Sequence, residues 1–254
     1  MKTGCFGMKL YIGVGALWLA GFTAWGQMPS DGAPGGMSGA LTRLFGDIKA
    51  FSAKADVQVQ DTNQEQIADM AMDFAFLEGK IRVEMDLTQM KNRNMPPGMA
   101  AALKQMGMAH VISIVRPDKQ RAYAVYPDQK AVLTMPLPEE GADPTNTTSK
   151  LKKTELGKET AEGHPCVKNK VLVTDNDGKT VEALTWNATD LKDFPVKIET
   201  TDKENTSVVR FQQINFARPE PNLFDPPPAY TVYDDPMAFQ QAMKKNLGDP
   251  VPPK

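Results

Sequence analysis

The chain has 254 residues, with 29 lysines and arginines against 31 acidic residues and a net charge of −2. A chain with this composition has no excess of basic residues from which to form the basic face that a nucleic-acid partner requires. It also has no net positive charge for attachment to anionic lipid head groups. We therefore predict no nucleic-acid partner. One of the two cysteines, Cys5, stands near the amino terminus, and Cys166 is the other.

The first 26 residues predict an export signal. Lys2 and Lys9 precede an apolar stretch, Leu10 to Trp25, that ends in small residues at the positions read by signal peptidase. The stretch is short for a bilayer span, which needs about 20 apolar residues, so a cleaved signal is favoured over a membrane anchor. We expect cleavage near Gln27 and a periplasmic location in a Gram-negative-type bacterium, with peripheral or no membrane contact afterwards.

Removal of residues 1–26 takes away two lysines and no acid, so the mature net charge becomes −4. Cys166 is then the remaining thiol, and an internal disulfide is excluded. Stability must come from an ordinary core, for which about 225 residues suffice as one domain.

We predict four parts along the chain: the signal peptide (1–26), a flexible leader (27–37), a single domain (38–235), and a carboxy-terminal helix with a proline-rich tail (236–254). The leader holds too little apolar surface to order itself. A short helix is expected after Ser38, because Leu41, Leu44, Phe45 and Ile48 fall on one helical face.

After Phe51 the apolar residues recur with period two, as in half-buried strands. The turn Glu78-Gly79-Lys80 lies between two such runs and predicts a β-hairpin over residues 66–88. A helix is expected over Met99–Met106. Further strands are expected at Val111–Val115, Ala122–Tyr126, Ala131–Met135, Val167–Thr174, Thr180–Trp186, Phe194–Thr200 and Val208–Phe216, and a late helix at Pro236–Leu247.

These elements predict an α+β fold with one antiparallel sheet. One face of the sheet is apolar throughout, and another part of the structure must cover it. If the sheet curls around the helices, it becomes a curved, incomplete (half-open) β-barrel capped by a few helices, with an apolar interior that can hold a ligand.

Four short motifs stand out along the chain: Phe51-Ser-Ala-Lys-Ala-Asp-Val, Gly163-His-Pro-Cys, the segment Trp186 to Lys197, and Leu223-Phe224-Asp225-Pro226. Over residues 40–233 the chain resembles an uncharacterised family of exported bacterial proteins. That family is related in fold to the periplasmic lipoprotein carrier and the outer-membrane lipoprotein receptor (LolA/LolB-like). The resemblance implies a hydrophobic cavity of the kind that accepts acyl chains in the carriers. None of the carriers' own functional residues is matched here, so none is carried over.

The leading hypothesis is a non-enzymatic carrier or sensor that holds an apolar ligand, such as a lipid or the acyl group of a protein. The residues predicted to line its cavity are Phe74, Phe76, Met85, Trp186, Phe194 and Phe211. Trp186 and Phe194 could line the mouth of the cavity, but a place in the core of the sheet is favoured for both, because large aromatic residues dominate ordinary cores. We predict no cofactor and no catalytic residue. Cys166 with His164 nearby suggests a thiol nucleophile, but a buried structural thiol is favoured because no activating environment is visible.

Two alternatives remain open. Met95, Met99, Met106, Met108 and His110 combine thioether and imidazole groups that suit Cu(I), although methionines at such spacing also pack cores. The other alternative is an envelope module that docks a protein partner. The sequence leaves the oligomeric state open.

Overall fold

A computed structural model describes residues 44–93, 95–137, 150–174, 180–201 and 205–246. Within these ranges the chain forms one sheet of 13 strands and two α-helices. The strands are β1 (Ala50–Asp61), β2 (Gln66–Leu77), β3 (Lys80–Asp86), β4 (Lys91–Asn92), β5 (His110–Arg116), β6 (Arg121–Tyr126), β7 (Ala131–Pro136), β8 (Lys150–Ala161), β9 (His164–Thr174), β10 (Thr180–Ala188), β11 (Phe194–Thr201), β12 (Asn205–Asn215) and β13 (Thr231–Tyr233). The helices are α3 (Met99–Gln105) and α4 (Pro236–Asn246), and short 3-10 helices are η1 (Pro117–Lys119), η2 (Pro127–Gln129) and η4 (Pro221–Phe224).

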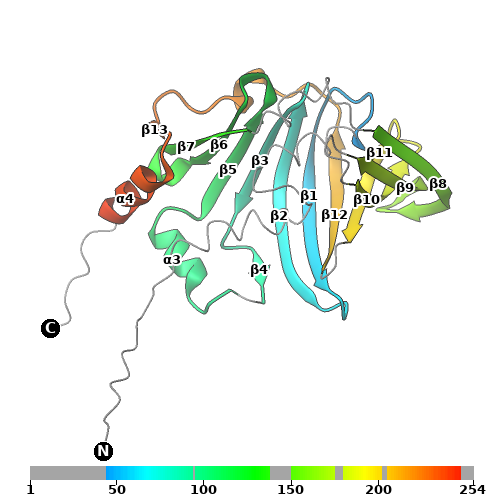
Figure 1. The fold of residues 1–254 in the computed structure, drawn as a ribbon, viewed down its shortest axis with the longest axis horizontal. Coiled ribbons are helices and arrows are strands. Elements are labelled where there is room, and N and C mark those ends of the chain that lie inside the picture. The colour runs from blue at the N-terminus through cyan, green and yellow to red at the C-terminus, as the bar shows by residue number, and fades with distance from the viewer. Residues whose placement is uncertain (1–43, 94, 138–149, 175–179, 202–204, 247–254) are drawn as a thin grey trace, which may run out of the picture.

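The sheet consists of two up-and-down halves joined in the middle. Its strand order is β13-β7-β6-β5-β3-β2-β1-β12-β11-β10-β9-β8, with β4 paired to β2 beside this path. The antiparallel pair of β1 and β12 joins the halves. Among the described residues the end strands β13 and β8 do not pair with each other, so the curved sheet stays open (Figure 1). The predicted curved, half-open antiparallel fold is confirmed, except that β13 pairs parallel with β7.

The predicted hairpin over residues 66–88 is confirmed. β2 and β3 pair from Leu77 opposite Lys80 to Met72 opposite Met85. Glu78 and Gly79 between them both have left-handed backbone angles, with φ of 51° and 86°. Two successive left-handed residues give the tight turn whose twist matches that of the flanking strands.

An aromatic core covers one face of the sheet, which we call the inner face. In β1, buried residues alternate with more exposed ones from Phe51 to Val59, as a strand with one covered face requires. Phe51 contacts five further phenylalanine rings, with centroid separations of 4.7 to 6.4 Å. They are Phe45, Phe74, Phe76, Phe194 and Phe211.

Helix α4 covers the inner face at the other end of the sheet, beside β13 and β7 (Figure 1). The ring of Phe239 lies 5.1 Å from that of Tyr126 and 5.6 Å from that of Tyr233. Met243 and Phe239 are buried there, so the helix packs against the inner face of the sheet.

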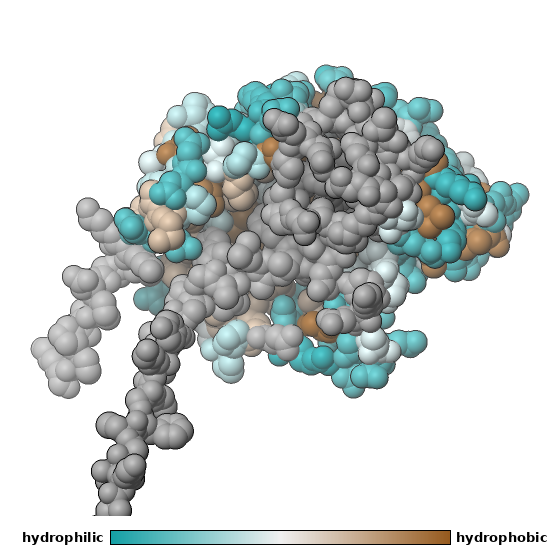
Figure 2. Space-filling model, in the orientation of Figure 1, coloured by the Kyte–Doolittle hydropathy of each residue, from teal (hydrophilic) through white to brown (hydrophobic). Residues whose placement is uncertain are grey.

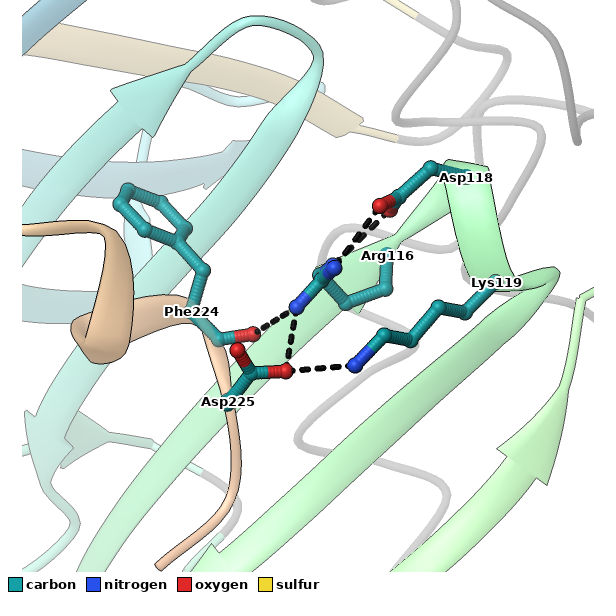
Figure 3. A network of polar contacts seen from close by, with 5 residues as sticks. All are labelled: Arg116, Asp118, Lys119, Phe224 and Asp225. Carbon is teal, nitrogen blue, oxygen red and sulfur yellow. Dashed lines mark hydrogen bonds and ion pairs between the residues drawn. The ribbon is translucent and has the colours of Figure 1, made fainter.

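The opposite, outer face is closed near β5 by the segment that contains Leu223-Phe224-Asp225-Pro226. Phe224 is buried among apolar residues of β2, β5, β6 and β7. The guanidinium of Arg116 donates two hydrogen bonds to the carboxylate of Asp118, each of 2.8 Å, and also bonds Asp225 (Figure 3). Lys119 donates to the same Asp225 carboxylate at 2.7 Å. This motif is therefore a structural attachment of the late chain to β5.

Strand β8 was not predicted from the sequence. Its twelve residues pair with β9, from Lys150 opposite Thr174 to Ala161 opposite His164. The strand is polar and mostly exposed because it lies at the edge of the sheet, so it lacks the apolar alternation by which strands are recognised.

Several predicted segments lie outside the described residues: the signal peptide, the leader and the tail after residue 246. Of the helix expected after Ser38, the part from Leu44 onward is described. Helices α3 and α4 confirm the other two helix predictions. Within the described residues, no helix has the length and apolar character needed to cross a bilayer.

Candidate ligand-binding site

Four of the six residues predicted to line a cavity come together on the inner face. Phe74, Phe76, Phe194 and Phe211 surround the ring of Phe45, which is stacked on Phe194 at 5.5 Å and lies 5.6 to 6.0 Å from the others. Met85 packs beside them, partly buried. All four phenylalanines are buried, and Phe45 from the amino-terminal segment occupies the space in front of them.

Trp186 lies on the outer face. Its neighbours across the sheet are Lys168 on β9 and Lys197 on β11, whose ammonium groups lie 4.7 and 3.9 Å from the ring centroid. Its indole N–H donates to the carboxylate of Glu159. Thr185, the preceding residue on β10, is directed to the inner face, as alternation along a strand requires. Trp186 and Phe194 nevertheless belong to one buried hydrophobic cluster of the described residues.

A cavity of about 560 Å³ lies between residues 44–50 and the inner side of β8, β9 and β10. Its apolar wall includes Leu44, Phe45, Ile48, Val171 and Phe216. Phe45 and Phe216 also contact Phe194, so the cavity adjoins the aromatic core. Leu151 on β8, 40% exposed, stands at its rim. Figure 2 shows apolar side chains among hydrophilic ones at this end of the molecule.

Part of the cavity wall is polar. Thr185 and Asn187 from β10 line it and are buried. The side-chain oxygen of Asn187 accepts hydrogen bonds from the hydroxyl of Thr185, at 2.7 Å, and from the amide of Asn169, at 3.1 Å. The amide nitrogen of Asn187 donates to the main-chain oxygen of Asp193 at 2.8 Å. A satisfied buried network of this kind fixes its members rigidly.

Two of the sequence motifs meet beside this wall. The main-chain oxygen of Pro165 accepts hydrogen bonds from both the N–H and the hydroxyl of Thr189, at 2.9 and 3.0 Å. His164 Nδ1 lies 2.9 Å from Asp190 Oδ2, and that contact is the main cause that lowers the pKa of Asp190. The motif at 163–166 therefore fastens the β8–β9 turn to the β10–β11 loop.

Cys166 is a buried thiol, as favoured from the sequence. Its Sγ lies 3.4 Å from the main-chain oxygen of His164 and 3.8 Å from that of Ala161. Burial raises the pKa of Cys166, and the carboxylates of Asp190, Glu159 and Glu162 add to the shift. A raised pKa disfavours the thiolate, which is the nucleophilic form.

The Cu(I) alternative has its residues on both faces of the sheet. Met106 and Met108 pack in the inner-face cluster with Phe239. His110 shares the outer face with Glu84, whose Oε1 lies 2.6 Å from its Nε2. Among the described residues there is no group of three or more His, Cys, Asp or Glu side chains placed to hold a metal.

Sequence reasoning missed the residues that line this cavity, and none of the six predicted residues is among them. Asn187 and Lys192 belong to a motif that the sequence analysis names, but no local pattern predicts that they lie on a cavity wall. One signal was available: Ala183, Thr185 and Asn187 alternate along β10 and place two polar residues on an otherwise apolar face.

No protein-family model and no curated protein matches the chain. Among solved structures it is similar to a LolA superfamily protein of Nitrosomonas europaea, with 8% identity and a TM-score of 0.36 over 72% of this chain and 93% of that one. It is similar to the lipoprotein LppX of Mycobacterium tuberculosis, with 12% identity and a TM-score of 0.40 over 73% and 97%. It is also similar to a chain of the MucA/MucB complex of Pseudomonas aeruginosa, with 15% identity and a TM-score of 0.39 over 77% and 62%.

Proposed function

We propose that this protein is an exported, non-enzymatic binding protein that holds an apolar, acyl-like ligand. The cavity between residues 44–50 and β8–β10 carries the proposal. Its volume of about 560 Å³ falls within the range of about 300–1,000 Å³ of small-molecule sites.

The lining of the cavity supports an apolar ligand. Leu44, Phe45, Ile48, Val171 and Phe216 come from three separate parts of the chain and make up the apolar wall of the cavity. The predicted cavity residues Phe74, Phe76, Phe194 and Phe211 stand behind Phe45 and hold its ring in place. An apolar ligand in front of this wall gains the hydrophobic free energy of leaving water, in proportion to its buried area.

A non-enzymatic role is supported by the state of the reactive groups near the cavity. The thiol of Cys166 is buried with a raised pKa, and the ring of His164 is held by Asp190. These groups therefore serve the connection between the two turns, and we assign no catalytic residue.

The experiment has two parts. Protein purified mildly from its native host is extracted with organic solvent, and the extract is analysed by mass spectrometry. The apo protein is then titrated with a fluorescent fatty-acid probe. An extracted amphiphile or saturable probe binding is expected; an empty extract together with no probe binding overturns the proposal.

Two leucines of β8 provide a matched pair of variants for the titration. Leu151 lines the cavity, whereas Leu156 on the same strand does not, and both are exposed, at 40% and 52%. Leu151→Trp introduces a bulky ring at the rim and should weaken probe binding, while Leu156→Trp should leave it unchanged. Equal effects of the two variants contradict binding in this cavity.

The edge of β8 favours a second candidate, an interaction module. Within the described sheet β8 pairs with β9 alone, so the main-chain N–H and C=O groups on its other side have no neighbouring strand. Two leucines of β8 are also exposed. Such an edge can accept an extended peptide as an added strand. Crosslinking in cells should then enrich one partner with the wild type and lose it with Leu156→Lys; background recovery from both counts against this candidate.

A further inference from the structure

The charged groups at the rim of the cavity point to the kind of head group that its ligand carries. Three lysines and two aspartates line the cavity: Lys49, Lys153, Lys192, Asp47 and Asp193. The rim is therefore net positive, although the whole chain carries a net charge of −2. Local charge of the opposite sign to a ligand favours its capture.

Two of these charges neutralise each other. Lys153 on β8 donates to the carboxylate of Asp193 at 2.9 Å. This pair links the edge strand to the β10–β11 loop and leaves Asp193 engaged. Within the part of the chain that the structure describes, Lys192 has no carboxylate at ion-pair distance, so its positive charge is uncompensated there.

Lys192 is held over the apolar wall. Its ammonium lies 4.8 Å from the centroid of the Phe216 ring, which lines the cavity. A lysine over an aromatic face is attracted by the ring's negative π-surface. The positive charge therefore lies beside the apolar lining of the cavity.

The backbone that presents Lys192 is strained. Lys192 and Asp193 both have left-handed backbone angles, with φ of 55° and 61°, and neither is glycine. Residues other than glycine adopt this region rarely. The loop is kept in place by the buried amide of Asn187, which donates to the Asp193 oxygen, and by the Asp193 N–H, which donates to the Ala188 oxygen at 3.1 Å. Strain retained by such surrounding contacts is typical of functional loops.

We propose that the ligand is a single-chain amphiphile with an anionic head group, and that Lys192 is the specificity-determining residue that binds this head. The apolar chain lies along Leu44, Ile48 and Phe216, and the head remains at the rim beside Lys192. This inference rests on the proposed function. A carboxylate and a phosphate monoester are both anionic head groups that fit this proposal, and a binding experiment distinguishes between them.

The test measures the affinity of the full chain for four ligands of equal chain length, below their micelle concentrations. These are a fatty acid, a lysophosphatidic acid, the corresponding fatty alcohol and a zwitterionic lysophosphatidylcholine. The wild type should bind at least one of the two anionic ligands more tightly than the alcohol and the zwitterion, and added salt should reduce that preference. The preferred anion identifies the head group as carboxylate or phosphate.

Lys192→Gln should weaken binding of the preferred anion by about fivefold, the effect of one exposed charge contact, and leave the alcohol unaffected. Lys130→Gln is the matched control, because Lys130 is also an exposed lysine with a left-handed backbone, φ 48°, and does not line the cavity. Lys192→Arg should retain the preference.

The outcomes distinguish the two proposals. If the wild type binds none of the four ligands, the proposed function fails. If it binds all four alike, or if Lys192→Gln weakens the alcohol as much as the anion, the cavity still binds apolar chains and the assignment of Lys192 is overturned.

Discussion

The guanidinium of Arg116 on β5 donates a hydrogen bond of 3.1 Å to the main-chain oxygen of Phe224, a residue 108 positions later. Phe224 is buried on the outer face, and Arg116 also bonds the carboxylate of the next residue, Asp225. One side chain from the amino-terminal half therefore fixes where the last part of the chain runs (Figure 3).

Arg116→Met should lower the free energy of unfolding by about 2 kcal/mol, because the Phe224 oxygen and the Asp118 carboxylate lose their bonds from Arg116, while the Asp225 carboxylate keeps only that from Lys119. Urea denaturation measures the change. Arg93→Met is the matched control: Arg93 also pairs with two carboxylates, those of Asp61 and Glu65, but its side chain is 48% exposed. It should cost less than about 1 kcal/mol. Equal losses would contradict the special role of Arg116.

The same network predicts a loss of stability in acid. A hydrogen bond from Arg116 lowers the pKa of Asp118 below its ordinary 3.8, and one from Lys119 lowers that of Asp225. A carboxyl group whose pKa is lower in the folded state stabilises that state above the unfolded pKa, and the contribution is lost as the pH falls through the folded pKa. Urea midpoints should therefore fall between about pH 5 and about pH 2. Arg116→Met should show a shallower fall, and parallel curves would exclude this network as the cause.

Replacement by alanine of two glycines with left-handed backbone angles should lower the stability of the protein by different amounts. Gly46, with φ 57°, has open space where a Cβ would stand, whereas a Cβ at Gly107, with φ 63°, would lie 2.5 Å from Nε2 of Gln129. That nitrogen donates to the main-chain oxygen of Met106 at 2.6 Å. Both substitutions cost about 1 kcal/mol for the backbone angle, and Gly107→Ala should cost measurably more in thermal unfolding. A larger loss at Gly46 would run against this geometry.

Phe45→Ala should be among the costliest substitutions in the aromatic core, at about 3 kcal/mol or more, because its ring is buried against five others. Phe216→Ala serves as the comparison, since Phe216 is partly buried and contacts one of those rings, that of Phe194. Chemical denaturation should rank the loss at Phe45 well above that at Phe216; the reverse order would mean that Phe45 does not hold the core together.

Cys166 should react slowly with iodoacetamide in the folded protein, because burial both shields the thiol and raises its pKa. In a Cys5→Ala background Cys166 is the one thiol of the chain. Labelling followed by mass spectrometry should accelerate in step with urea unfolding. Rapid labelling of the native protein would revive the nucleophile hypothesis.

Much of the fold could be predicted because its signals are local. The alternation from Ile81 to Leu87 and the turn at Glu78-Gly79 specify a hairpin without reference to the rest of the chain. β8 gave no such signal, because an exposed edge strand needs no apolar side and forms through main-chain bonds to β9. The site was predicted less well: Trp186 and Phe194 belong to one motif, yet the indole of Trp186 contacts Lys168, Lys197 and Glu159, whereas the Phe194 ring packs on Phe45 and Phe51.

The sequence by itself determined the periodicity, the turns and the overall class of this protein, because side-chain alternation and turn chemistry act over a few residues. The tertiary structure alone decided that β1 pairs with β12, that Phe45 stands in front of the aromatic core and that Lys192 overlooks a cavity. The pairing of β1 with β12 and the stacking of Phe45 on Phe194 join residues more than a hundred positions apart. A local pattern carries no information about which distant segment supplies the partner.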